Sequence, residues 1–319
     1  MDLRGKRLLV IGGAGFIGSH LLDHLVCEDV AEISVYDDFT RGTRPNIAAA
    51  LRDPRVRIFE LGGSILHTDI LNAAMKGVDC VFHLAALWLL HCNDFPRSAF
   101  EVNVAGTFNV LEACIANKVQ RLIYSSSASV YGDALQVPMT EDHAFNNRTF
   151  YGATKIAGEQ MARAFHQRFG LDYVGLRYMN IYGPRQDMKS VYTSVIMKVL
   201  DRIEEGKAPI VYGDGSQTYD FLYVEDAARA NIAAAKATAT DRCYNIGRGE
   251  GTSVKSLVEM LLAATGSPLK IQYEPAGQTF VTQRVGSTDA ARRDLGFEAT
   301  TDLAEGIRRI IAWRREQTR

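Results

Sequence analysis

Two side chains that could exchange protons lie four residues apart near the middle of the chain. Tyr151 and Lys155 occupy positions i and i+4 of a segment with a helical pattern, so both project from one face of that helix. A phenol with its ordinary pKa of about 10 is a weak base at neutral pH. A neighbouring ammonium stabilises the phenolate and lowers that pKa. The pair predicts proton exchange with a substrate hydroxyl, although this spacing is also common in helices without any such role.

A run of hydroxyl side chains precedes this pair. Ser125, Ser126 and Ser127 follow an apolar segment, residues 121–124, that predicts a buried strand. Hydroxyls at the carboxyl end of a parallel strand lie in the crevice where α/β proteins bind their ligands. Ser127 is therefore the candidate partner of the reacting hydroxyl. For Ser125 and Ser126, hydrogen bonding at the strand end is the alternative.

A glycine-rich turn near the N-terminus could hold a pyrophosphate. Residues 8–11 predict a strand, and Gly12, Gly15 and Gly18 follow it with the spacing G-x-x-G-x-x-G, where a helical pattern begins. Gly12 permits the tight turn, Gly15 allows the close approach of an anion, and Gly18 allows close helix packing. The N-terminus of that helix offers unpaired N–H groups and a positive dipole end. A tight strand-to-helix turn without a ligand is the alternative.

An acidic residue after the second predicted strand specifies the ligand further. Asp37 stands about 20 residues after the glycine turn, where a carboxylate accepts hydrogen bonds from a ribose hydroxyl. The same carboxylate repels a 2′-phosphate, so the sequence favours NAD over NADP. Arg41 and Arg44 lie close by and keep NADP as the minor alternative.

The elements that must position these groups alternate between apolar runs and helical patterns, which predicts a parallel sheet covered on both faces. The predicted strands are residues 8–11, 33–36, 56–59, 80–84 and 121–124, and the predicted helices between them include 17–27, 69–75 and 100–117. In the second half we predict helices at 154–169, 226–239, 253–264 and 303–315, and strands at 171–176 and 271–273. The predicted fold class is α/β, a Rossmann-type doubly wound parallel sheet with a smaller mixed α/β C-terminal substrate lobe.

The expected domain division follows from this change of pattern. Residues 1–177 are expected to form the NAD-binding Rossmann domain, with 213–244 returning to it. Residues 178–212 and 245–319 are expected to form the lobe that binds the substrate.

Composition excludes several classes of partner. The 319 residues carry 36 Lys and Arg against 37 Asp and Glu, a net charge of −1, so no basic excess predicts a nucleic-acid polymer or a membrane surface as partner. The five cysteines are dispersed without a C-x-x-C pair, which predicts reduced thiols and neither a disulfide framework nor a metal site. We see no signal peptide and no apolar stretch approaching the roughly 18 residues that span a bilayer. We expect a soluble, cytoplasmic protein.

Taken together, these features resemble the extended short-chain dehydrogenase/reductase family, and within it the NAD-dependent sugar-nucleotide epimerases. Further segments carry the resemblance over essentially the whole chain, in the family's order: 82–86 (FHLAA), 103–107 (NVAGT), 177–184 (RYMNIYGP), 212–215 (YGDG) and 220–226 (DFLYVED). The resemblance implies NAD as cofactor and a nucleotide-diphosphate sugar, foremost a UDP-sugar, as substrate. It implies inversion at C4 through a transient 4-keto sugar, with tightly bound NAD. It also implies a homodimer formed by the helices at 100–117 and 154–169.

The resemblance implies roles for single residues. Ser127 would hydrogen-bond the reacting hydroxyl, Tyr151 would act as acid and base, and Lys155 would bind the nicotinamide ribose while tuning Tyr151. The implied cofactor contacts are Gly12, Gly15, Phe16, Ile17, Asp37, Asp38, Ser64, Ile65, Leu84, Ala85, Ala86, Asn103, Ser125, Tyr151, Lys155 and Tyr178. The implied substrate contacts are Ser127, Asn180, Tyr212, Tyr219 and Arg284. A loop or capping role is the alternative for Asp38, packing is the alternative for Tyr178, and His83 is expected to be a core histidine.

The chain departs from the family pattern at three places. Ser64 stands where the family commonly has an aspartate that holds the adenine amino group. Tyr219 replaces the arginine of the family's Q-T-R-D-F segment, which normally meets the substrate diphosphate. Near the family's R-P-G-D turn the nearest downstream cation is Arg284, which either substitutes for that arginine or is solvated. An unusual loop at 87–92, with Trp88 and His91, either faces the sugar or packs.

Related reactions use the same first oxidation. Sugar-nucleotide 4,6-dehydratases carry Asp-Glu directly after the catalytic hydroxyl and uronate decarboxylases carry Glu in that stretch, whereas this chain has Ala128 and Ser129. The sequence therefore disfavours both. An NAD(P)-dependent 4-keto-sugar reductase remains the main alternative, since it needs the same Ser, Tyr and Lys and differs in releasing its cofactor. A redox-sensing module without activity would not need a tuned phenol.

Overall fold

One sheet of seven parallel strands forms the centre of the larger lobe in this computed structural model, which describes residues 1–186, 195–276 and 281–317. The strands are Arg7–Ile11 (β1), Glu32–Tyr36 (β2), Val56–Ile58 (β3), Cys80–His83 (β4), Arg121–Ser127 (β5), Tyr173–Tyr178 (β6) and Arg242–Ile246 (β11). Their order is β11-β6-β5-β4-β1-β2-β3, and each neighbouring pair is parallel. This arrangement confirms the predicted Rossmann-type α/β fold.

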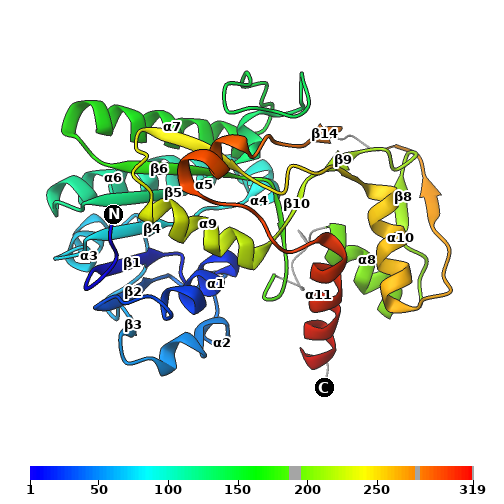
Figure 1. Cartoon of the computed structure of the whole chain (residues 1–319), viewed down its shortest axis with the longest axis horizontal. Helices are drawn as coiled ribbons and strands as arrows, with labels where there is room; N and C mark the ends of the chain where they lie inside the picture. The colour runs from blue at the N-terminus through cyan, green and yellow to red at the C-terminus, as the bar shows by residue number, and fades with distance from the viewer. Residues whose placement is uncertain (187–194, 277–280, 318–319) are drawn as a thin grey trace.

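Helices cover both faces of the sheet because its strands bury successive side chains on opposite sides. The covering helices are Phe16–Leu25 (α1), Thr68–Ala74 (α3), Thr107–Ala116 (α6), Phe150–Phe169 (α7) and Val224–Lys236 (α9). Leu8 and Val10 of β1 belong to a core shared with α1 and α9. Leu9 and Ile11 belong to a second core shared with α3, α6 and α7. Figure 1 shows α6 and α7 on one side of the sheet and α1 and α9 on the other.

A smaller mixed lobe follows, on the right in Figure 1. Its core joins the helices Val195–Glu204 (α8), Val254–Thr265 (α10) and Leu303–Gln317 (α11). Short strands complete it: Asn180–Tyr182 (β7), Ile210–Tyr212 (β8), Thr218–Tyr219 (β9), Phe221–Tyr223 (β10), Thr252–Ser253 (β12), Gln272–Glu274 (β13) and Gln283–Arg284 (β14). The pairs are β7 with β10, β8 with β13, and β9 with both β12 and β14. This core is separate from the two that cover the large sheet, as the predicted mixed lobe requires.

Shorter elements connect these parts. They are Arg44–Ile47 (α2), Ala50–Arg52 (η1), Leu89–Asp94 (α4), Pro96–Ala99 (α5), Phe100–Gly106 (η2), Ala128–Val130 (η3) and Ala291–Leu295 (η4). The helix predicted at 100–117 therefore begins with a wider, π-type segment before α6. The loop predicted at 87–92 is largely the short helix α4, which Trp88 opens by accepting a hydrogen bond from Cys92 N at 2.9 Å.

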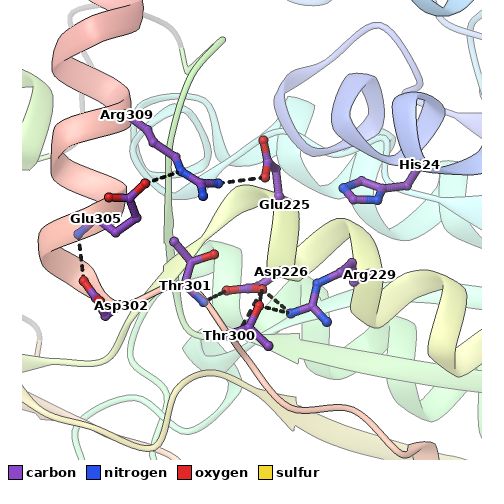
Figure 2. A pocket seen from close by; sticks show the side chains of 9 residues that line it. All are labelled: His24, Glu225, Asp226, Arg229, Thr300, Thr301, Asp302, Glu305 and Arg309. Carbon is purple, nitrogen blue, oxygen red and sulfur yellow. Dashed lines mark hydrogen bonds and ion pairs between the residues drawn. The ribbon is translucent and has the colours of Figure 1, made fainter.

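A polar hollow lies where α1, α9 and α11 approach each other, and Figure 2 shows its lining. The buried carboxylate of Asp226 accepts hydrogen bonds from the backbone N–H groups of Thr300 and Thr301 at 3.3 and 3.0 Å, and pairs with Arg229. Arg309 of α11 bridges to α9 by pairing with Glu225 at 3.2 Å. The hollow thus ties the segment before α11 to α9.

The described residues show neither a metal cluster nor a membrane span. No helix among them is long and apolar enough to cross a bilayer. No group of three or more His, Cys, Asp or Glu side chains within the described ranges could hold a metal ion. All five cysteines are free.

Candidate active site

The glycine turn joins β1 to the N-terminus of α1 in a conformation that needs glycine. Gly12 has a φ of +79°, and a Cβ there would lie 2.8 Å from Ala85 N. A Cβ at Gly18 would lie 2.2 Å from the Gly12 carbonyl oxygen, so the helix could not pack as closely. Gly15 occupies the N-cap position of α1, where no side chain accepts a hydrogen bond from the helix. A Cβ at Gly15 would meet only the Gly12 oxygen within 4 Å. Because no side chain caps the first N–H groups of α1, they fit a pyrophosphate.

Asp37 lies directly after β2 and holds this turn. Its Oδ2 accepts a hydrogen bond from Ala14 N at 2.8 Å, and its Oδ1 accepts one from Phe39 N at 2.8 Å. Burial raises the pKa of Asp37, and these N–H donors oppose the rise. Each carboxylate oxygen keeps a second lone pair for a ribose hydroxyl. The half-buried carboxylate thus supports the turn and still fits its predicted role.

The other residues predicted around the adenosine lie beside Asp37. A Cβ on Gly63 would lie 2.0 Å from the Asp37 backbone, so the segment before Ser64 touches the end of β2. The Ser64 carbonyl accepts a hydrogen bond from the Tyr36 hydroxyl at 2.8 Å. Asp38 Oδ1 accepts one from Thr40 N at 2.9 Å, as its alternative loop role requires.

Ser127, Tyr151 and Lys155 come together where β5 ends and α7 begins. Thr149 caps α7 by accepting a hydrogen bond from Gly152 N at 3.1 Å, which fixes the first turn that carries Tyr151. The Ser127 hydroxyl hydrogen-bonds Tyr151. Lys155 Nζ donates to the Ser125 carbonyl at 2.7 Å and lies 5.6 Å from the centre of the Tyr151 ring. The structure therefore brings the three predicted catalytic residues into one cluster.

The electrostatics of this cluster differ from the expectation. Burial raises the pKa of Tyr151 to about 12, against the Ser127 hydrogen bond and the charge of Arg284, which lower it. Burial lowers the pKa of Lys155 to about 8. The predicted lowering of the Tyr151 pKa is therefore not found in the protein by itself, because burial of the phenol outweighs the Ser127 hydrogen bond and the charge of Arg284. The phenolate that proton exchange requires is therefore not favoured in the protein by itself.

A buried ion pair behind the cluster was missed by the sequence analysis. Glu159 of α7 lies one turn beyond Lys155 and accepts two hydrogen bonds from the Arg177 guanidinium, at 2.9 and 2.7 Å. Ser126 Oγ donates to the same carboxylate at 2.5 Å. These bonds lock α7 to β5 and β6. The only signal in the sequence was the spacing of four between Tyr151, Lys155 and Glu159.

The side chains of Asn103 and His83 hydrogen-bond other groups of the protein. The buried Asn103 amide accepts a hydrogen bond from Leu87 N at 2.7 Å and donates to Leu87 O at 2.8 Å and to Thr154 Oγ1 at 3.1 Å. It therefore positions the segment after β4, which contains the predicted contacts Leu84, Ala85 and Ala86. His83 Nε2 pairs with a threonine hydroxyl at 3.1 Å, and burial lowers the pKa of His83 to about 3, as expected for a core histidine.

Two predicted substrate residues present donors that lack a protein partner. Asn180 Nδ2 and Arg284 Nε are both buried without a hydrogen bond among the described residues. Such atoms are costly unless a ligand or water satisfies them. Arg284 is placed by β14, where Thr282 N and Gln283 N donate to Asp133 Oδ1 at 2.8 and 3.2 Å. Burial raises the pKa of Tyr151, and the positive charge of Arg284 opposes that rise.

The remaining predicted contacts lie on β9, β8 and β6. The Tyr219 hydroxyl donates to Val281 O at 2.9 Å, so this phenol secures the strand pair β9–β14. Tyr212, at the end of β8, is 55% exposed and lies on an open surface. The Tyr178 hydroxyl is buried between Ser125 and Asn231, at 3.3 and 3.1 Å.

Known proteins share this architecture. The model of the NAD dependent epimerase/dehydratase family matches residues 8–247. A putative UDP-glucose 4-epimerase of Methanocaldococcus jannaschii is 33% identical over 98% of this chain and 99% of its own. The structure of UDP-N-acetylglucosamine 4-epimerase from Methanobrevibacter ruminantium, in complex with UDP-N-acetylmuramic acid, superposes with a TM-score of 0.92 at 30% identity, covering 98% and 99% of the two chains. That of a dTDP-glucose 4,6-dehydratase from Streptomyces venezuelae, with NAD bound, gives 0.90 at 28% identity, covering 97% of each.

Proposed function

The chain belongs to the NAD-dependent epimerase/dehydratase family, and on that premise we propose that it inverts C4 of a nucleotide-diphosphate sugar, foremost a UDP-sugar, through a transient 4-keto sugar. The observation that carries this proposal is the cluster of Ser127, Tyr151 and Lys155 at the carboxyl end of β5. UDP-sugar 4-epimerases among the similar proteins support the epimerisation and the choice of a UDP-sugar as substrate.

NAD is the cofactor of this family, and the residues of this chain fit it. The N–H groups at the start of α1, which no side chain caps, would hold the pyrophosphate, and Asp37 would accept hydrogen bonds from the adenosine ribose. Lys155 would hold the nicotinamide ribose. When bound, NAD supplies the acceptor and donor of the C4 hydride.

The chain's own residues handle the proton. Acting as the phenolate, Tyr151 takes the proton of the C4 hydroxyl on its Oη as C4 becomes a carbonyl. It remains a neutral phenol while the ketose turns over, and then gives the proton back to the C4 oxygen. Ser127 orients that oxygen through its hydroxyl. The charge of Arg284 favours the phenolate before the first transfer and after the second, against the burial that raises the Tyr151 pKa. We propose that Lys155, whose Nζ lies 5.6 Å from the centre of the Tyr151 ring, adds to this effect.

The stretch after Ser127 favours epimerisation over dehydration. Ala128 is buried, and Ser129 donates its N–H back to Ser127 Oγ at 3.1 Å. Asp133 is engaged with the backbone of β14, and Glu141 accepts a hydrogen bond from Asn245 N at 2.9 Å. A 4,6-dehydratase needs an acid and a base beside C5 and C6, and these carboxylates already serve the fold.

A panel of sugar nucleotides tests the proposal. The purified protein is denatured to measure its bound NAD, and the intact protein is incubated with UDP-, GDP-, CDP- and dTDP-sugars while products are followed by NMR. We expect retained NAD and a C4 epimer without net oxidation. Loss of water would indicate a dehydratase instead. Consumption of added NADH or NADPH would indicate a 4-keto-sugar reductase.

Arg284 is expected to bind an anionic group of the substrate, either the diphosphate or an acidic group on the sugar. Replacing it by glutamine should raise KM or lower kcat/KM by about 10–100-fold, because charge-assisted hydrogen bonds are lost. Kinetics on the best substrate of the panel measure this, with Arg293→Gln, an exposed arginine paired with Asp294, as the matched control. An unchanged KM together with an unchanged kcat/KM in Arg284→Gln would show that this guanidinium does not bind the substrate.

The quaternary structure and the domain division are proposed on the same basis. Phe108 of α6 and Phe169 of α7 are 40% and 54% exposed. The ring of Phe108 contacts Phe165 edge to face, and the ring of Phe169 contacts it at a tilt. We propose that α6 and α7 pair with a second copy in a homodimer. We also propose that residues 1–177 with 213–244 hold the cofactor, while 178–212 and 245–319 hold the substrate.

A further inference from the structure

A cation–aromatic stack joins two loops on either side of the glycine turn. Arg41 lies in the loop after β2, and its guanidinium carbon is 4.7 Å from the centre of the Trp88 ring, in the segment after β4. In the sheet order β4-β1-β2, the strand between these two loops is β1, which ends in the glycine turn. Parallel strands all end at the same edge, so the stack spans the carboxyl end of β1.

Both loops are anchored next to the stack. On one side, the Asn103 amide holds Leu87 by its N–H and its carbonyl, at 2.7 and 2.8 Å. On the other side, Thr43 N donates to Ala14 O at 3.1 Å, inside the glycine turn itself. The stacked side chains lie at the surface, since Arg41 is exposed and Trp88 only half-buried. Their meeting is therefore set by the two loops and not by core packing.

We propose that Arg41 and Trp88 form a clasp over the dinucleotide, which slows both its release and its entry. The inference rests on the proposed binding of NAD. A dinucleotide that reaches from Asp37 after β2 to Lys155 beyond β4 must cross the end of β1, between the glycine turn and the stack. The Arg41 guanidinium also brings a positive charge to the path of the pyrophosphate.

The clasp answers a demand of the proposed reaction. An epimerase removes a hydride and returns the same hydride to the other face of C4, so its cofactor must stay bound through both transfers. A reductase instead exchanges its cofactor in every cycle. A contact that slows the exit of NAD therefore fits the first reaction and hinders the second.

The test measures the exchange of NAD on the holoenzyme. The exchange is measured on wild type and on the variants Trp88→Leu, Arg41→Gln and Arg41→Gln/Trp88→Leu. Each protein is loaded with labelled NAD, and release of the label is followed after dilution into excess unlabelled NAD. Rebinding to protein stripped of NAD gives the entry rate. We expect about tenfold faster release and faster entry in each single variant, and little further change in the double variant. Arg44→Gln is the matched control, because Arg44 stacks on Phe39 of its own loop at 5.3 Å, and it should exchange NAD as wild type does.

Each possible result of the exchange experiment either supports the clasp or contradicts it. Wild-type release rates in Trp88→Leu and Arg41→Gln would overturn the clasp and leave the proposed function intact. Faster release with unchanged entry would also overturn it, since that pattern indicates an ordinary contact with the bound cofactor. A wild-type protein that bound no NAD would overturn the proposed function and the clasp together.

Discussion

Replacing Tyr151 by phenylalanine is expected to lower kcat for the C4 epimerisation of a UDP-sugar by about 10²–10⁴-fold. The variant keeps the ring but loses the hydroxyl that hydrogen-bonds Ser127 and that we propose exchanges the proton of the C4 hydroxyl. Lys155 keeps its bond to the Ser125 carbonyl, so the NAD content should stay that of wild type. Single-turnover NMR and the absorbance of released NAD measure the two quantities.

A second tyrosine separates the chemical role from the mere loss of a buried hydroxyl. Tyr244 is buried, and its hydroxyl bonds Asp294 at 3.3 Å, away from the Ser127 cluster. Tyr244→Phe should therefore turn over substrate at nearly the wild-type rate. If Tyr151→Phe did the same, the proton would have to move through another group, and the assigned role of Tyr151 would be wrong.

Local patterns were enough to predict six of the seven strands of the sheet and the cluster of Ser127, Tyr151 and Lys155, whereas the edge strand β11 was not predicted. Strands buried on both faces are continuous apolar runs, which is why residues 8–11 predicted β1 within one residue of its start. The glycine turn was readable because each glycine has a steric reason along a few residues of chain. Tyr151 and Lys155 were readable because a helix places residues four apart on one face.

Properties that depend on distant contacts were not predictable. The pKa of Tyr151 rises because of the surroundings that the fold assembles around it, whereas the sequence showed only the nearby lysine. The hydrogen bonds of the Asn103 amide to the segment after β4 and to α7 could not be predicted, because these partners lie far from Asn103 in the sequence. Arg284 could not be placed from its motif, since Asp133, far away in sequence, fixes β14 beside the site.

The ion pair of Glu159 and Arg177 shows how such distant contacts support the site. The Glu159 carboxylate accepts hydrogen bonds from Ser126 of β5 and Arg177 of β6. Glu159 lies one turn from Lys155 on α7. Arg177 also donates to the Tyr131 hydroxyl at 2.7 Å, in the segment that follows Ser127. The pair therefore sets the distance between the strand that carries Ser127 and the helix that carries Tyr151.

Removing one partner of this pair should destabilise the protein strongly. Arg177→Met leaves the Glu159 carboxylate, which is 3% exposed, without its cation. The free energy of unfolding is expected to fall by about 3–5 kcal/mol, as for other buried charges that lose a partner. Urea unfolding followed by circular dichroism measures the change.

The double variant Glu159→Gln/Arg177→Met distinguishes the charge from the packing. It removes both charges, so we expect it to be more stable than Arg177→Met alone, because no uncompensated carboxylate remains buried. The exposed pair of Arg308 and Glu305 supplies the control, since Arg308→Met should change the stability by less than about 1 kcal/mol. A loss in Arg177→Met as small as this control would mean that water reaches Glu159 freely. The ion pair could then not be what holds α7 against β5 and keeps Ser127 within reach of Tyr151.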